Sequence, residues 1–205
     1  MTDVHKALAE LETIRSQIAS VLEFRGYGPA TLAATGLLAV LAAALQGMLI
    51  RQPARHPGTY LKLWVATAAL SLALISLEAV SRVRRSQSAL ALPMLRSAGE
   101  EFLPAIVAGL LVTVVIWRGA PQDIWILPGL WQVLFSLGVF ASCRLLPRPM
   151  FGAGLWYLAS GLVLLAHASC PCTLSPWAMG IPFGIGQTVV AAVLWTAYRE
   201  HHEIA

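Results

Sequence analysis

Charged residues are scarce in this sequence. Only 12% of its 205 residues are Asp, Glu, Lys or Arg, whereas 58% are hydrophobic. The apolar residues form long runs instead of recurring at the spacing of a soluble core, which is the composition of a membrane protein. The net charge of +4 is explained by basic residues at the membrane surface and their contacts with lipid, so it does not indicate nucleic-acid binding.

Motifs for catalysis are also missing. The sequence contains no Gly-rich nucleotide loop, metal-protease histidine pair, G-x-S-x-G turn or paired intramembrane aspartates. Its five histidines fall at or beyond the ends of the apolar runs, which argues against haem held between helices. We therefore predict a non-enzymatic protein, and no cofactor is predicted.

The apolar residues form six runs. A hydrocarbon layer of about 30 Å needs roughly 20 residues per helix, with ~17 near the lower limit. The third run is short unless the stretch before it, residues 90–101, joins it. The six runs are residues 29–50, 60–80, 102–117, 124–143, 150–166 and 177–198. We predict an all-α fold, a bundle of six transmembrane helices formed by residues 29–198 and followed by a tail at residues 199–205.

The basic residues predict the orientation, because Lys and Arg are retained on the cytoplasmic side. A cytoplasmic N-terminus places ten basic residues inside and four outside, so we expect both termini in the cytoplasm. Arginine makes up twelve of the 14 basic residues, which is typical of a GC-rich bacterial genome and points to a bacterial inner membrane. The residues expected to form an outer aromatic belt are Tyr60, Trp64, Trp117, Trp125 and Trp177.

Residues 1–28 precede the first run and form a separate unit. Apolar residues recur there at three- and four-residue steps, which predicts an amphipathic helix. Its mixed charges leave two roles open for residues 2–24: lying in the membrane interface, or packing against a second copy or a partner membrane protein. Gly26 and Gly28 then form a hinge before Pro29.

Three glutamines, Gln46, Gln132 and Gln187, fall inside uncharged runs. In one interpretation they form hydrogen bonds between helices, each worth about 1 kcal/mol or less. In the other they line a cavity together with Pro182 and Gly184, where the sequence "IPFGIGQ" is a partly unwound helix of the kind that transporters use.

Glu78 is the one carboxylate within a predicted run. Arg82 follows it by one helical turn, so we expect an ion pair. A role in proton coupling is the alternative.

The stretch "HASCPC" places His167, Cys170 and Cys172 in an outward loop. It has three interpretations: a loop without chemistry, a strained disulfide between Cys170 and Cys172, or a site for zinc or cuprous copper that also uses His167. Cys143 is expected at the opposite face of the membrane.

The stretches "EFRGYGPAT", "LPGLWQVLFSLGVFASCRLLPR" and "SPWAMGIPFGIGQ" resemble a group of small, uncharacterised, multi-pass bacterial membrane proteins. The resemblance implies the same class of protein, and no activity, cofactor or site comes with it.

Together these features predict an accessory, sensory or complex-forming subunit that acts through protein–protein contacts. The first alternative is a small-solute transporter that uses the fourth and sixth helices. The second alternative is a periplasmic thiol or metal redox protein.

Overall fold

The computed structural model describes residues 28–50, 52–85, 91–143, 149–167 and 171–202. Within these ranges every regular element is helical, which confirms the all-α prediction. The six α-helices are α2 (Pro29–Leu49), α3 (Pro57–Arg85), α4 (Ala91–Gly119), α5 (Leu127–Ser142), α6 (Met150–Ala166) and α7 (Pro176–His202). Two short 3₁₀ segments complete the described elements. The first, η1 (Pro121–Ile126), precedes α5, and the second, η2 (Pro171–Leu174), precedes α7.

Among the residues that the structure describes, five helical segments are long and apolar enough to cross a membrane. They are α2, α3, the part of α4 from Gly99 to Gly119, η1 joined to α5, and α7 up to Thr196. The apolar helix α6 has 17 residues and is shorter than these. Proline begins several of the elements, because its fixed φ angle suits the first turn and its missing N–H has no partner there.

The short third run and the stretch before it form one helix, α4, as the sequence allowed, and this helix passes through Pro104. Other helix boundaries differ from the sequence-based prediction. Helix α3 extends from Pro57 to Arg85, beyond both ends of the predicted run 60–80. The fourth run is divided into η1 and α5 at Leu127. Helix α7 continues past Tyr198 to His202, into the predicted tail. The predicted N-terminal helix lies outside the described residues, except for Gly28, which is the N-cap of α2.

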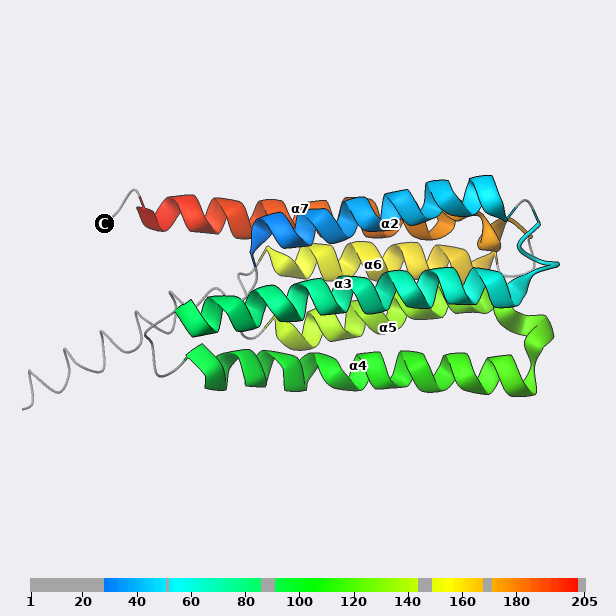
Figure 1. Ribbon diagram of the computed structural model, residues 1–205, viewed down its shortest axis with the longest axis horizontal. Helices are drawn as coiled ribbons and strands as arrows, with labels where there is room; N and C mark the ends of the chain where they lie inside the picture. The colour runs from blue at the N-terminus through cyan, green and yellow to red at the C-terminus, as the bar shows by residue number, and fades with distance from the viewer. Residues whose placement is uncertain (1–27, 51, 86–90, 144–148, 168–170, 203–205) are drawn as a thin grey trace, which may run out of the picture.

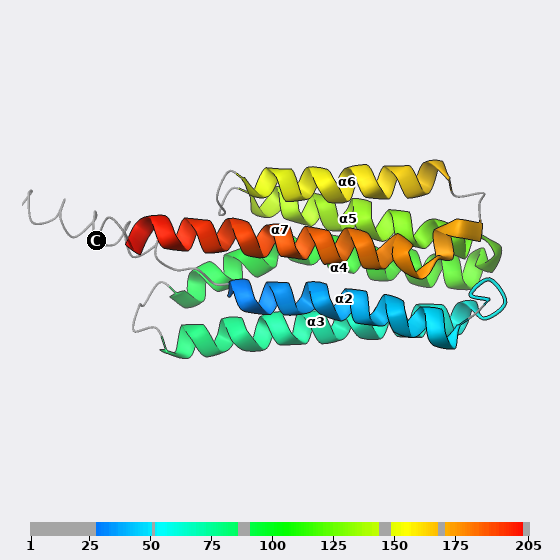
Figure 2. The ribbon, with the colours of Figure 1, turned by 90° about the horizontal axis from the view of Figure 1, so that it is seen from above.

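The helices lie side by side along one long axis, and α2 begins at the same end of the bundle where α7 ends (Figures 1 and 2). Helix α2 packs along α7, and α5 packs along α6. Helix α4 lies at the edge of the bundle against α5 (Figure 1). Only 6% of the residues in its apolar window are buried, compared with 44% in the windows of α5 and α7.

Glycines allow close approach in two helix pairs, α2 with α7 and α5 with α6. A Cβ atom added to Gly180 of α7 would lie 2.5 Å from the Cβ atom of Ala43 in α2. A Cβ atom added to Gly161 of α6 would lie 2.8 Å from the carbonyl oxygen of Gly129 in α5. Small residues let transmembrane helices approach this closely, and the van der Waals contact between them replaces the hydrophobic driving force that lipid removes.

The predicted aromatic belt is wrong for two of its five residues. Trp117, Trp125 and Trp177 are 40–50% exposed, and their segments lie at one end of the bundle (Figure 1). Tyr60 and Trp64 are instead buried, with exposures of 0% and 4%. They belong to a core cluster that also contains residues of α2, α4, α5 and α7, and Trp64 has a polar partner inside the protein.

Candidate functional site

The partner of Trp64 is Gln46, which is fully buried in α2. The indole Nε1–H of Trp64 donates to Gln46 Oε1 at 2.7 Å, and Gln46 Nε2 donates to the carbonyl oxygen of Leu174 at 2.8 Å. One amide therefore joins α2, α3 and the end of η2. Because both sides of the amide are bonded within the protein, Gln46 acts as a structural connection at this end of the bundle.

Gln132 of α5 is bonded to α7 next to Pro182. Proline has no backbone N–H, so a proline inside a helix leaves the carbonyl oxygen four residues earlier without its donor. In α7 that oxygen belongs to Ala178, and Gln132 Nε2 donates to it at 2.9 Å. The Gln132 amide thus supplies the hydrogen bond that Pro182 removes.

A second side chain donates to the same part of α7. The indole Nε1–H of Trp156, in α6, lies 3.0 Å from the carbonyl oxygen of Pro182 and donates to it. With these two donors in place, α7 is a continuous α-helix from Pro176 to His202. The structure therefore contradicts the alternative interpretation, in which Pro182 to Gln187 form a partly unwound helix, and a neighbouring helix satisfies the backbone oxygen that Pro182 leaves free.

Gln187 lies further along α7 and is 8% exposed. Its Cβ atom packs against Gly36 of α2, and its side chain is close enough to the Tyr157 hydroxyl of α6 to interact with it. Neither Gln187 Oε1 nor the Tyr157 hydroxyl has a hydrogen-bond partner among the described residues. These two groups form a small polar region inside the otherwise apolar bundle.

The three glutamines do not come together. Gln132 meets α7 at Ala178, nine residues before Gln187, and this spacing corresponds to about 13 Å along the helix axis. Gln46 is bonded to Leu174, before α7 begins. Each glutamine therefore serves a different level of the bundle, and the transporter alternative loses the shared site on which it depended.

A groove of about 490 Å³ opens between α2 and α7. Gly184 is one of its lining residues, whereas Pro182 and the three glutamines are not. The residues that line it are mostly apolar: Ala33, Gly36, Leu37, Val40, Trp177, Gly180, Ile181, Gly184, Ile185, Thr188 and Val189. This composition suits contact with hydrocarbon better than binding of a polar solute.

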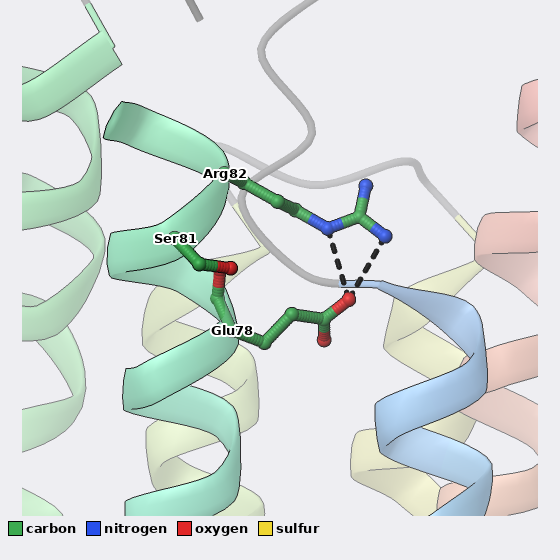
Figure 3. Close-up of polar contacts among 3 residues, drawn as sticks. All are labelled: Glu78, Ser81 and Arg82. Carbon is green, nitrogen blue, oxygen red and sulfur yellow. Dashed lines mark hydrogen bonds and ion pairs between the residues drawn. The ribbon is translucent and has the colours of Figure 1, made fainter. Parts of the chain in front are cut away.

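Glu78 and Arg82 lie together near the beginning of α2 (Figure 3). Arg82 Nη2 is 2.9 Å from Glu78 Oε1, and both side chains are partly exposed. A Cβ atom on Gly28 would collide with the Glu78 carboxylate, so glycine permits the pair to approach the N-cap of α2. A carboxylate is favourable there because the helix dipole places positive charge at that end.

The predicted metal ligands lie largely beyond what the structure describes. His167 ends α6, and its Nδ1 atom lies 2.9 Å from the carbonyl oxygen of Val163 in the same helix. Cys170 and the side chain of Cys172 fall outside the described residues, so their metal site and disulfide stay predictions. Within the described part of the chain, no group of three His, Cys, Asp or Glu side chains is placed to hold a metal.

The fold and these polar contacts are compatible with an integral membrane protein, since several long apolar helices are joined by buried hydrogen bonds. No protein-family model, curated protein or solved structure matches the chain.

Sequence reasoning did not predict the contacts of three aromatic residues: Trp156 and Tyr157 were not singled out, and Trp64 was assigned to the aromatic belt. The sequence shows each as an aromatic residue in an apolar run, which is also how a lipid-facing residue appears. Gly154 and Gly161 lie on the same helix as Trp156 and Tyr157 and were a usable signal, because small residues mark the side of a helix that packs closely.

Proposed function

We propose that this chain is a non-enzymatic, complex-forming subunit of a bacterial inner membrane, and that it acts through contacts with a second copy or a partner membrane protein. The observation that carries this proposal is the uneven burial of the helices. Only 17% and 6% of the residues are buried in the apolar windows of α3 and α4, against 39–44% for α2, α5 with η1, and α7. Inside the bundle, Gln46 and Gln132 bond to other segments of the same chain.

The outer surface of α4 is the proposed contact surface within the membrane. Its large apolar side chains are widely exposed, including Leu110 at 54%, Leu111 at 60% and Val115 at 66%. Lipid covers this surface in the isolated chain. A partner helix that packs on it would gain van der Waals contact, which drives association of helices in a bilayer.

Residues 2–24 supply the second proposed contact, on the cytoplasmic side. The mixed charges of that segment suit packing against protein better than binding to anionic lipid. Deletion of this segment and alteration of α4 therefore test two separate parts of the same proposal.

The experiment is purification from the source membrane in lipid nanodiscs, followed by measurement of the mass of the assembly. Val115→Trp places a large side chain on α4, and Val163→Trp places the same side chain on α6, where Val163 is 59% exposed. We expect Val115→Trp and deletion of residues 2–24 to reduce the assembled fraction, and Val163→Trp to leave it unchanged. A wild-type protein that purifies only as a monomer would contradict the proposal.

The proposal includes six spans with both termini in the cytoplasm. Helix α6 supports the sixth span, because its 17 residues extend about 26 Å and it packs against both α5 and α7. Figure 2 shows it at the edge of the bundle, beside α5. Single-cysteine variants at the exposed residues Gln52 and Arg84, with the three native cysteines replaced, test this arrangement. An impermeant maleimide should label position 52 in spheroplasts and position 84 only after lysis; the reverse result would contradict it.

A further inference from the structure

Helix α7 contains a short stretch of residues with low helix propensity. Between Gly180 and Gly186 it has three glycines and Pro182. Glycine and proline are the two residues with the lowest helix propensity, and Pro182 also interrupts the backbone hydrogen bonds of the helix. The continuity of α7 here therefore depends on groups outside the helix.

The external donors are few. Gln132 Nε2 bonds to Ala178 across the proline, and Trp156 bonds to the Pro182 carbonyl oxygen on the other side of the break. The remaining polar atom of Gln132, Oε1, is buried and has no partner among the described residues, and the second contact of Nε2 is a 3.7 Å approach to the sulfur of Met179. One strong bond thus connects Gln132 to the segment that precedes Pro182.

The groove between α2 and α7 extends across this break. Trp177, Gly180 and Ile181 line it before Pro182, and Gly184 and Ile185 line it after Pro182. A change in the angle between the two parts of α7 would therefore alter the shape of the groove, because its wall belongs to both parts.

We propose that Pro182 is a hinge in α7 and that the hydrogen bond from Gln132 to Ala178 is the latch that holds the hinge closed. When this bond breaks, the segment Pro176–Ile181 moves relative to the rest of α7 and reshapes the groove against α2. The latch acts because it replaces a backbone donor that proline lacks. Its effect must therefore depend on the presence of Pro182.

The test is a double-mutant cycle followed by amide hydrogen exchange of the full chain in nanodiscs. Gln132→Leu removes the latch, and Pro182→Ala restores the backbone N–H that bonds to Ala178. In the native background, Gln132→Leu should accelerate exchange of the amides at residues 183–186 by about tenfold, which corresponds to the stronger intramembrane hydrogen bonds. In the Pro182→Ala background the same change should have almost no effect on these amides.

Thr113→Val is the matched control, because it removes the bond from Trp131 of α5 to Thr113 of α4 and leaves α7 untouched. It should not change amide exchange at residues 183–186.

Equal acceleration by Gln132→Leu in both backgrounds would overturn the proposal, since the bond would then be an ordinary helix–helix contact. Unchanged exchange in the native background would overturn it as well. If Gln132→Leu does not fold, recovery of folding by Pro182→Ala supports the latch, and failure to recover overturns it.

Discussion

Replacing Gln46 by leucine should destabilise the bundle through loss of two hydrogen bonds. The change leaves the indole N–H of Trp64 and the carbonyl oxygen of Leu174 without the partners they have at 2.7 and 2.8 Å. Hydrogen bonds between transmembrane helices average about 0.6 kcal/mol and reach about 1.7 kcal/mol. Gln46→Leu should therefore lower the free energy of unfolding by about 1–3 kcal/mol, a decrease of about 5- to 150-fold in the folding equilibrium constant.

The assay is unfolding by SDS in mixed micelles, followed by tryptophan fluorescence. Trp64→Phe removes one of the two bonds and should have about half the effect of Gln46→Leu. The comparison variant is Gln187→Leu, the same substitution at a buried glutamine that lies near Tyr157 but whose Oε1 atom has no hydrogen-bond partner among the described residues. It should change the free energy of unfolding by less than about 1 kcal/mol.

The comparison between these glutamines decides whether hydrogen bonding is the cause. If Gln187→Leu destabilises the protein as much as Gln46→Leu does, the cost comes from altered packing of a buried side chain, and the inference from the bonds of Gln46 is refuted. If Trp64→Phe has no effect, the bond to the indole contributes nothing measurable.

Two further substitutions test the close contacts of glycine in the same unfolding assay. Gly161→Ala places a methyl group against a backbone oxygen of α5 and should lower the free energy of unfolding by about 1–3 kcal/mol. The control, Gly152→Ala on the same helix, meets nothing within 4 Å and should be neutral or stabilising by up to about 1 kcal/mol. Similar losses of stability at both positions would refute the glycine contact. Gly28→Ala should cost less than about 1 kcal/mol, because it displaces only the flexible ends of the partly exposed Glu78–Arg82 pair. Adding Glu78→Gln to Gly28→Ala should then have little further effect, and full additivity of the two changes would contradict their coupling.

Hydropathy alone predicted the helical class and most of the helix positions, because apolar runs of this length have few other structures in a bilayer. Boundaries were harder to predict. The run ending at Trp117 is too short by itself, yet the more polar residues before it continue the same helix, α4. Its Arg96 and Glu100 form an ion pair one turn apart, which suits an exposed helix end.

The roles of the glutamines could not be predicted, since they depend on which residues face each other across helices. Gln132 and Gln187 follow similar Pro–Gly patterns in the sequence, but only Gln132 lies opposite a carbonyl oxygen that proline leaves free. Pro182 likewise resembled the break of a transporter helix, although donors from α5 and α6 keep it helical. The missing information is the rotation of each helix about its axis. It cannot be read from the sequence, because a helix that is apolar on nearly all sides has no polar face to show which side is buried.

The pairing of α2 with α7 has a consequence for synthesis. Gln46 and Leu174 are 128 positions apart in the chain, and a ribosome adding about 5–20 residues per second needs about 6–25 s to cover that distance. Trp64 follows Gln46 by only 18 positions and becomes available much earlier. During the interval the glycine and alanine side of α2 has no α7 to pack against, so the nascent bundle must retain its first membrane helices without their main partner until the last helix has been made.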